Sequence, residues 1–157
     1  ASSMGRLFDA VASLVLAKYK VSQEAELAME LERIAKIASP GYKFNIINEG
    51  GVYILDPLPM IKEIVKDIKV KKAKEEIAYR FHLAIAEMVR KICLVLRKEA
   101  KINSVVLSGG VFQNTLLLGL ASDLLYREGF SVFRHQNLSC NDSGISLGQA
   151  VIASLAS

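Results

Sequence analysis

The stretch from Ser104 to Thr115, SVVLSGGVFQNT, constrains the fold of this chain more than any other. Val105 to Leu107 is an apolar run typical of a short buried strand, and Ser108-Gly109-Gly110 interrupts it. An apolar pattern at helical spacing follows from Phe112 to Arg127. A strand that enters a helix through a glycine pair brings bare backbone amides to the positive end of the helix, where phosphate or a nucleotide binds. A tight turn without a ligand is the alternative interpretation.

The composition indicates one folded domain, residues 1–157, with a substantial core. With 52% hydrophobic and 23% charged residues, the chain does not resemble disordered proteins. No apolar run reaches the ~18 residues that a membrane span needs, and we expect no signal peptide. Cys93 and Cys140 lack metal-type spacing, so we expect reduced thiols and a cytoplasmic location.

The net charge of +4 comes largely from lysines between Lys62 and Lys74. Acidic residues are mixed among these lysines, as on the solvated face of a helix, and an acidic partner is the alternative explanation. Because no aromatic side chains alternate with the lysines, the pattern does not favour nucleic-acid binding.

Hydrophobic periodicity predicts a helix-rich α/β fold with a small mixed sheet flanked by helices. We expect helices over residues 5–18, 22–38, 57–68, 72–99, 112–127 and 145–155, and strands over 44–47, 52–55, 104–107 and 130–133. Gly50-Gly51 predicts a hairpin between the first two strands. The last two strands and the helix between them form a βαβ unit, so these strands should be parallel. In the final helix the residues expected to face the core are Ile145, Gly148, Ile152 and Leu155.

Three polar clusters are candidates for chemistry. They are the glycine turn with Asn114, the segment Asn141-Asp142-Ser143-Gly144, and Asp9 in an otherwise apolar helix. Each also has a purely structural interpretation. Asn114 and Asp142 are residue types that cap helices or bond their own turns. Asp9 lies three residues after Arg6 on one helical face, where the two would form an ion pair.

Several strings resemble the hydrogenase-maturation carbamoyltransferase family HypF, and they occur in the family's order from end to end. The strings are Ser2 to Ala12 (SSMGRLFDAVA), Ala28 to Glu32 (AMELE), Phe81-His82, Leu107 to Asn114 (LSGGVFQN) and Asn141 to Ala150 (NDSGISLGQA). The GGVFQN and NDxGISLGQ strings are specific, so the resemblance covers essentially the whole chain.

The resemblance implies half of an actin-like (ASKHA) ATPase domain, similar to the tRNA threonylcarbamoyl-adenosine synthase. The chain would be the C-terminal nucleotide-binding lobe, without the upstream lobe. Such proteins use carbamoyl phosphate and ATP, form carbamoyl-adenylate, and pass the carbamoyl group to the C-terminal cysteine of a partner, HypE, to make a cyanide ligand of hydrogenase. The implied partners are the upstream half of the domain and a HypE-like acceptor. A homodimer is expected if an apolar face is left uncovered.

Position by position, the resemblance also implies site residues. Gly109 and Gly110 would line the nucleotide-phosphate pocket. Asn114 would contact the adenylate, and Asp9 would face the nucleoside at its ribose. Asp142 would be a metal ligand that completes a site with two histidines, for a divalent metal such as Zn or Fe. No catalytic residue is identified.

Two departures from the family pattern stand out. Ala25 replaces the family glycine after the first helix, which should weaken binding of the nucleoside there. The family's two metal-binding histidines lie upstream of this chain, and neither His82 nor His135 has a partner at His-x3-His spacing. We expect His82 to be structural and His135 to face solvent.

Two other functions are alternatives to a HypF-like carbamoyltransferase. One is a threonylcarbamoyl-transfer protein acting on tRNA, which the Phe112-Gln113-Asn114 string and the modest charge disfavour. The other is an assembly lobe that docks another protein through its lysine-rich helix and does no chemistry. In either the main interpretation or the last, the isolated chain is expected to be inactive.

Overall fold

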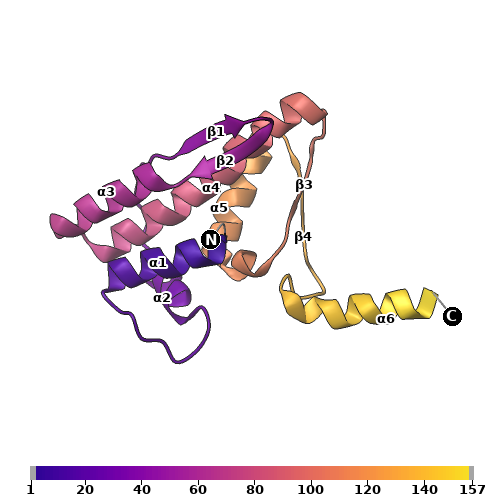
Figure 1. Ribbon diagram of the computed structural model, residues 1–157, viewed down its shortest axis with the longest axis horizontal. Coiled ribbons are helices and arrows are strands. Elements are labelled where there is room, and N and C mark those ends of the chain that lie inside the picture. Colours follow the sequence, from indigo (N-terminus) through magenta and orange to yellow (C-terminus); the bar gives the residue numbers. More distant parts are fainter. Residues whose placement is uncertain (1–2, 156–157) are drawn as a thin grey trace.

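The computed structural model describes residues 3–155, and helices form the body of the molecule (Figure 1). The α-helices are α1 (Met4–Leu16), α2 (Glu26–Ile34), α3 (Leu58–Lys69), α4 (Lys74–Ala100), α5 (Thr115–Arg127) and α6 (Ile145–Leu155). The strands are β1 (Asn45–Glu49), β2 (Val52–Asp56), β3 (Ser104–Leu107) and β4 (Ser131–Arg134), and two short 3₁₀ helices are η1 (Gly110–Gln113) and η2 (Asp142–Gly144). The helix-rich α/β class expected from the sequence is confirmed.

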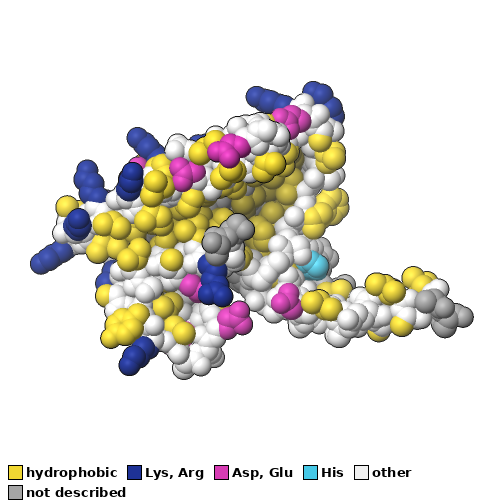
Figure 2. Space-filling model, in the orientation of Figure 1, with side chains coloured by type: hydrophobic (Ala, Val, Ile, Leu, Met, Phe, Trp, Pro, Cys, Tyr) yellow, Lys and Arg dark blue, Asp and Glu magenta, His cyan; other side chains and the backbone are white. Residues whose placement is uncertain are grey.

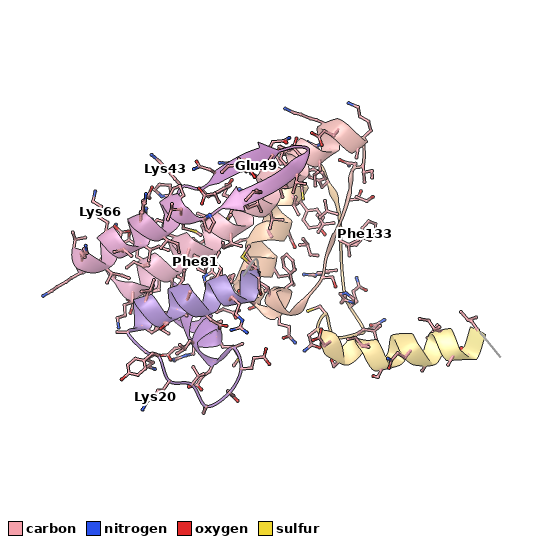
Figure 3. The ribbon with its side chains drawn as sticks, viewed as in Figure 1. Lys20, Lys43, Glu49, Lys66, Phe81 and Phe133 are labelled. Atoms are coloured by element: carbon pink, nitrogen blue, oxygen red, sulfur yellow. The ribbon has the colours of Figure 1, made fainter. Side chains whose placement is uncertain are left out.

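The core lies around α4, which packs against α1, α2, α3 and α5. The apolar stripe predicted for this helix is buried over its first half, where Ile77, Phe81 and Ile85 are fully enclosed. Phe81 packs edge-on against Phe8 of α1, with ring centroids 4.8 Å apart. Figure 3 labels Phe81 in this layer between α4 and α1. Burial of such rings stabilises the fold most, because each removes a large apolar area from water.

The strands form two separate pairs rather than the single mixed sheet expected from the sequence. β1 and β2 make the predicted antiparallel hairpin around Gly50 and Gly51, which both have positive φ. β3 and β4 are parallel, as the βαβ pattern predicts, with Val105 opposite Val132. Periodicity identifies strands, but the pairing of distant strands depends on the tertiary arrangement.

The second helix begins at Glu26, not at Ser22. The Ser22 amide and hydroxyl both donate to the Glu26 carboxylate at 2.7 Å, so Ser22 closes a turn before the helix rather than capping it. Ala25, the residue just before α2, has a left-handed backbone with φ 59°. That conformation interrupts any helix, which explains the later start.

The final helix does not bury the face predicted for it. The residues Ile145, Gly148, Ile152 and Leu155 are all exposed, and α6 projects away from the body (Figure 1). Val106, expected in a buried strand, is also exposed. An apolar pattern shows that a face is suited to burial, but not which element covers it. None of the helices within residues 3–155 is long and apolar enough to cross a membrane.

Candidate functional site

The carboxyl ends of β3 and β4 bring two of the predicted polar clusters together. The Gly109 amide donates to the Cys140 carbonyl at 2.9 Å. A Cβ added to Gly110 would lie 4.0 Å from the Cβ of Asn141. The glycine turn and the segment that leads into η2 therefore lie side by side, at the strand ends where α/β proteins bind ligands.

The glycine turn needs glycine at one position for its backbone. Gly109 has φ 102°, a conformation that residues with side chains rarely adopt, and a Cβ there would meet no atom within 4 Å. The positive φ is therefore the structural reason for glycine at position 109. The amides of Gly110 and Val111 donate to no acceptor within residues 3–155. They remain available to an anion beside the turn.

Asn114 caps α5 and also contacts a buried histidine. Its side-chain oxygen accepts from the Leu117 amide at 2.8 Å, which is the structural interpretation that the sequence allowed. Its Nδ2 lies 2.8 Å from Nε2 of His82, and Nδ1 of His82 lies 2.7 Å from the Ala78 carbonyl. Because a carbonyl only accepts, Nδ1 carries the proton and Nε2 accepts from Asn114.

His82 is fully buried in α4, in agreement with the expected structural role. Its ring packs edge-on against Phe8 at 5.3 Å between centroids. Desolvation is the largest influence on this group and lowers the pKa of His82. The imidazole is therefore neutral near pH 7, as its hydrogen bonds with Ala78 and Asn114 require.

Glu32 caps the start of α5, a contact that local sequence patterns did not predict. From α2, its Oε1 accepts from the Thr115 amide at 2.8 Å, the Thr115 hydroxyl at 2.7 Å and the Leu116 amide at 3.2 Å. With Asn114, this carboxylate satisfies the first three amides of α5. The start of α5 is thus occupied by the protein's own oxygen atoms, and the bare amides lie one turn earlier, at Gly110. The only signal for Glu32 was its place in the family string AMELE.

Asp9 and Asp142 are both exposed, and neither forms an ion pair within residues 3–155. The pairing of Asp9 with Arg6 considered above is absent. Asp9 lies in α1, whose first turn is close to η1. A Cβ added to Gly5 in that turn would lie 4.0 Å from the Val111 side chain. The cap of η2 is Asn141, which accepts from the Ser143 amide at 3.1 Å, rather than Asp142.

The carboxylate of Asp142 has no companion ligands in the part of the chain that the structure describes. No group of three His, Cys, Asp or Glu side chains within residues 3–155 is placed to hold a metal ion. A catalytic metal needs about three protein ligands. Asp142 can therefore supply one ligand to such a site but cannot form it with these residues alone.

An open cleft of about 390 Å³ lies beside the glycine turn. Gln113, Arg134, His135 and Cys140 contribute to its lining. At the carboxyl end of β3, the Ser108 hydroxyl lies 2.8 Å from Nε2 of His135, which follows β4. His135 is exposed, as expected. Sequence reasoning missed its contact with Ser108, although Ser108 directly follows the first of the two predicted parallel strands and His135 lies two residues after the second.

The backbone conformation at Ala25 favours glycine, which is the residue that the resemblance implies at this position. Its φ of 59° lies in the left-handed region, where glycine has no steric penalty and alanine does. The position therefore disfavours a side chain through the backbone conformation of this chain itself.

Comparison with known proteins accounts for nearly the whole chain. The family described as "Carbamoyltransferase, Kae1-like Domain, second subdomain" matches residues 1–149. Carbamoyltransferase HypF from Synechocystis is 31% identical over 94% of this chain, and HypF from Rhodobacter capsulatus is 31% identical over 97%. The chain spans only 19% of the length of either relative.

Solved structures agree with the sequence comparison. Full-length HypF in a phosphate- and nucleotide-bound form superposes on 96% of this chain with a TM-score of 0.90 and 41% identity, and this covers 20% of that protein. HypF of T. kodakarensis gives a TM-score of 0.78 and 29% identity over 98% of this chain and 20% of its own. The chain therefore belongs to the HypF carbamoyltransferase family, in the region that forms the second subdomain of its Kae1-like domain.

Proposed function

We propose that this chain is the nucleotide-binding subdomain of a HypF-type carbamoyltransferase. The complete enzyme would use carbamoyl phosphate and ATP, through carbamoyl-adenylate, to carbamoylate the C-terminal cysteine of a HypE-like acceptor in hydrogenase maturation. The observation that carries this proposal is the match to nucleotide-bound HypF at a TM-score of 0.90 over 96% of the chain.

The residues of the glycine turn fit a nucleotide phosphate. Gly110 and Val111 supply amides with no acceptor within residues 3–155, and the side of Gly109 that a Cβ would occupy is open. Backbone N–H groups stabilise negative charge without a side chain that would have to reorganise. Asp9, exposed on α1, would face the ribose. The side-chain oxygen and Nδ2 of Asn114 already bond Leu117 and His82. Asn114 would therefore contact the adenylate only through the remaining hydrogen-bonding capacity of these two atoms.

In the reaction, this subdomain would bind and orient the adenylate. A thiolate of the acceptor attacks the carbamoyl carbon, the bond from that carbon to the AMP phosphate oxygen breaks, and AMP leaves with the electron pair. A divalent metal, when bound, would polarise an oxygen of the reacting group. Asp142 would contribute one carboxylate oxygen to that metal, and the remaining ligands would come from outside residues 3–155.

The proposal is tested by measuring AMP binding calorimetrically with this chain alone and with the chain joined to the first subdomain of a HypF relative. We expect weak or no binding by the chain alone and clear binding by the joined protein. Gly109→Ala should reduce the affinity of the joined protein, because φ 102° is strained for alanine. Gly119→Ala is the matched control, since Gly119 lies in α5, has open space around it and shows no positive φ.

Two results would contradict the proposal. The first is AMP affinity that is equally low in the joined protein and in the isolated chain. The second is equal AMP binding by the Gly109→Ala and Gly119→Ala variants. Tight retention of Zn or Fe(II) by the isolated chain would contradict the assignment of Asp142 as a single contributed ligand.

A further inference from the structure

A single carboxylate links α2 to the start of α5. Oε1 of Glu32 accepts from the Thr115 amide at 2.8 Å, from the Thr115 hydroxyl at 2.7 Å and from the Leu116 amide at 3.2 Å. Within residues 3–155, these are the only hydrogen bonds that join the two helices. Glu32 is therefore the direct polar link between α2 and α5.

The two helices that this link joins each follow a segment of the candidate nucleotide site. α5 follows η1 and the glycine turn, where the amides of Gly110 and Val111 donate to no acceptor within residues 3–155. Figure 2 shows mostly backbone and uncharged polar atoms (white) at the surface around η1. α2 follows Ala25, the position where the resemblance implies contact with the nucleoside. The helix between Ala25 and Glu32 holds the two residues about 10 Å apart.

The start of α5 is also attached to α4 and α1, through His82. Nδ2 of Asn114, the residue before α5, lies 2.8 Å from Nε2 of His82. The ring of His82 packs against Phe8, the neighbour of Asp9 in α1, at 5.3 Å between centroids. His82 is fully buried and belongs to the core, whereas Glu32 is only partly buried. Loss of the Glu32 contact should therefore move the start of α5 and leave the core intact.

We propose that Glu32 is a positioning residue for the nucleotide, which fixes the glycine turn at a set distance from the segment that ends with Ala25. This inference rests on the proposed function, in which one nucleoside monophosphate contacts both places. The nucleoside would lie against the segment before α2, and the phosphate would bind the amides of the glycine turn. A ligand that contacts both segments binds best when they are already correctly spaced, because no rearrangement then opposes binding.

The charge of Glu32 argues for a positional role rather than a direct role in binding phosphate. A carboxylate at the start of a helix occupies the positive end of the helix dipole and repels another anion there. The amides that remain for a phosphate lie earlier, in the glycine turn. Glu32 therefore acts through the place where it holds α5. The reach of its side chain to Thr115 and Leu116 should matter more than its charge.

The test compares the affinities for AMP and for adenosine by calorimetry, in the chain joined to the first subdomain of a HypF relative. Glu32→Ala should weaken AMP binding about tenfold and adenosine binding less than about twofold, because only AMP contacts both segments. A purely structural loss would lower both affinities by the same factor. Glu32→Gln keeps an acceptor oxygen at the same reach and should restore AMP binding. Glu32→Asp keeps the charge on a shorter side chain and should not restore it.

Glu30→Ala is the matched control, since Glu30 also lies in α2 but pairs with Lys18 at 2.6 Å, away from α5. A second measurement uses this chain alone and needs no nucleotide. ¹⁵N relaxation gives order parameters for the amides of Gly110 and Val111, which are about 0.85 for a rigid backbone and below about 0.6 for a flexible one. Both values should be lower in Glu32→Ala than in wild type, and unchanged in Glu30→Ala.

Three outcomes would overturn the inference. In the first, Glu32→Ala loses affinity for AMP and for adenosine by the same factor. In the second, its AMP affinity is unchanged or rises, and a rise would make the carboxylate a competitor of the phosphate. In the third, the order parameters of Gly110 and Val111 in Glu32→Ala equal those of wild type. If the wild-type joined protein binds neither ligand, the proposed function fails, and the order parameters alone decide whether Glu32 positions the turn.

Discussion

Substitution of Asn114 by alanine tests whether this residue serves the fold before it serves a ligand. In the structure its oxygen caps α5 through the Leu117 amide, and its Nδ2 satisfies the buried Nε2 of His82. Alanine removes both bonds at once. Loss of the first bond leaves the Leu117 amide without its capping acceptor. Loss of the second leaves Nε2 of the fully buried His82 without a donor.

The expected cost follows from these two losses. Loss of a helix N-cap costs about 1 kcal/mol. A buried polar atom left without a partner costs about 1–3 kcal/mol. The free energy of unfolding should therefore fall by about 2–4 kcal/mol, a large part of the ~5–15 kcal/mol typical of a domain. With a slope of about 2 kcal/mol per M, the urea midpoint should fall by about 1–2 M.

The assay is urea unfolding followed by far-ultraviolet circular dichroism. Gln113→Ala is the control, because Gln113 is the exposed neighbour of Asn114 and should leave the midpoint almost unchanged. Asn114→Asp separates the two contributions, since it keeps an oxygen for the Leu117 amide but removes the donor to His82. It should recover only the capping part of the loss. A midpoint for Asn114→Ala within 0.2 M of Gln113→Ala would refute the reasoning.

The remaining predictions concern His82 and Ala25. Burial lowers the pKa of His82 in the folded state below its unfolded value of about 6.5. The stability that depends on the neutral ring is therefore fully present above about pH 6.5, and it is lost as the pH falls through the folded pKa. In His82→Gln the free energy of unfolding should fall less between pH 7 and 5 than in the wild type. Chemical unfolding that gives the same dependence on pH for the variant and the wild type would contradict this prediction. Ala25→Gly should raise stability by up to about 1 kcal/mol, because φ 59° is strained for alanine. A lower melting temperature than wild type would count against that explanation.

Sequence reasoning predicted the elements whose signals are local. The hairpin follows from Gly50-Gly51, the βαβ unit from the apolar runs around the Gly109-Gly110 turn, and the long central helix from its stripe through Phe81. The signal for each strand, turn or helix lies within that element's own residues, where backbone preference and periodicity act directly. The structural roles of His82 and the exposure of His135 were also predicted from their immediate surroundings.

Only the tertiary structure decided which groups meet across the chain. Glu32 caps a helix that begins 83 residues later, and Asn114 bonds a histidine 32 residues earlier. Neither contact leaves a mark in local spacing, because the partners meet only when α2, α4 and α5 pack together. The exposure of α6 has the same origin. Its amino acids determine that it is apolar, but burial depends on a neighbour, and within residues 3–155 no element covers it.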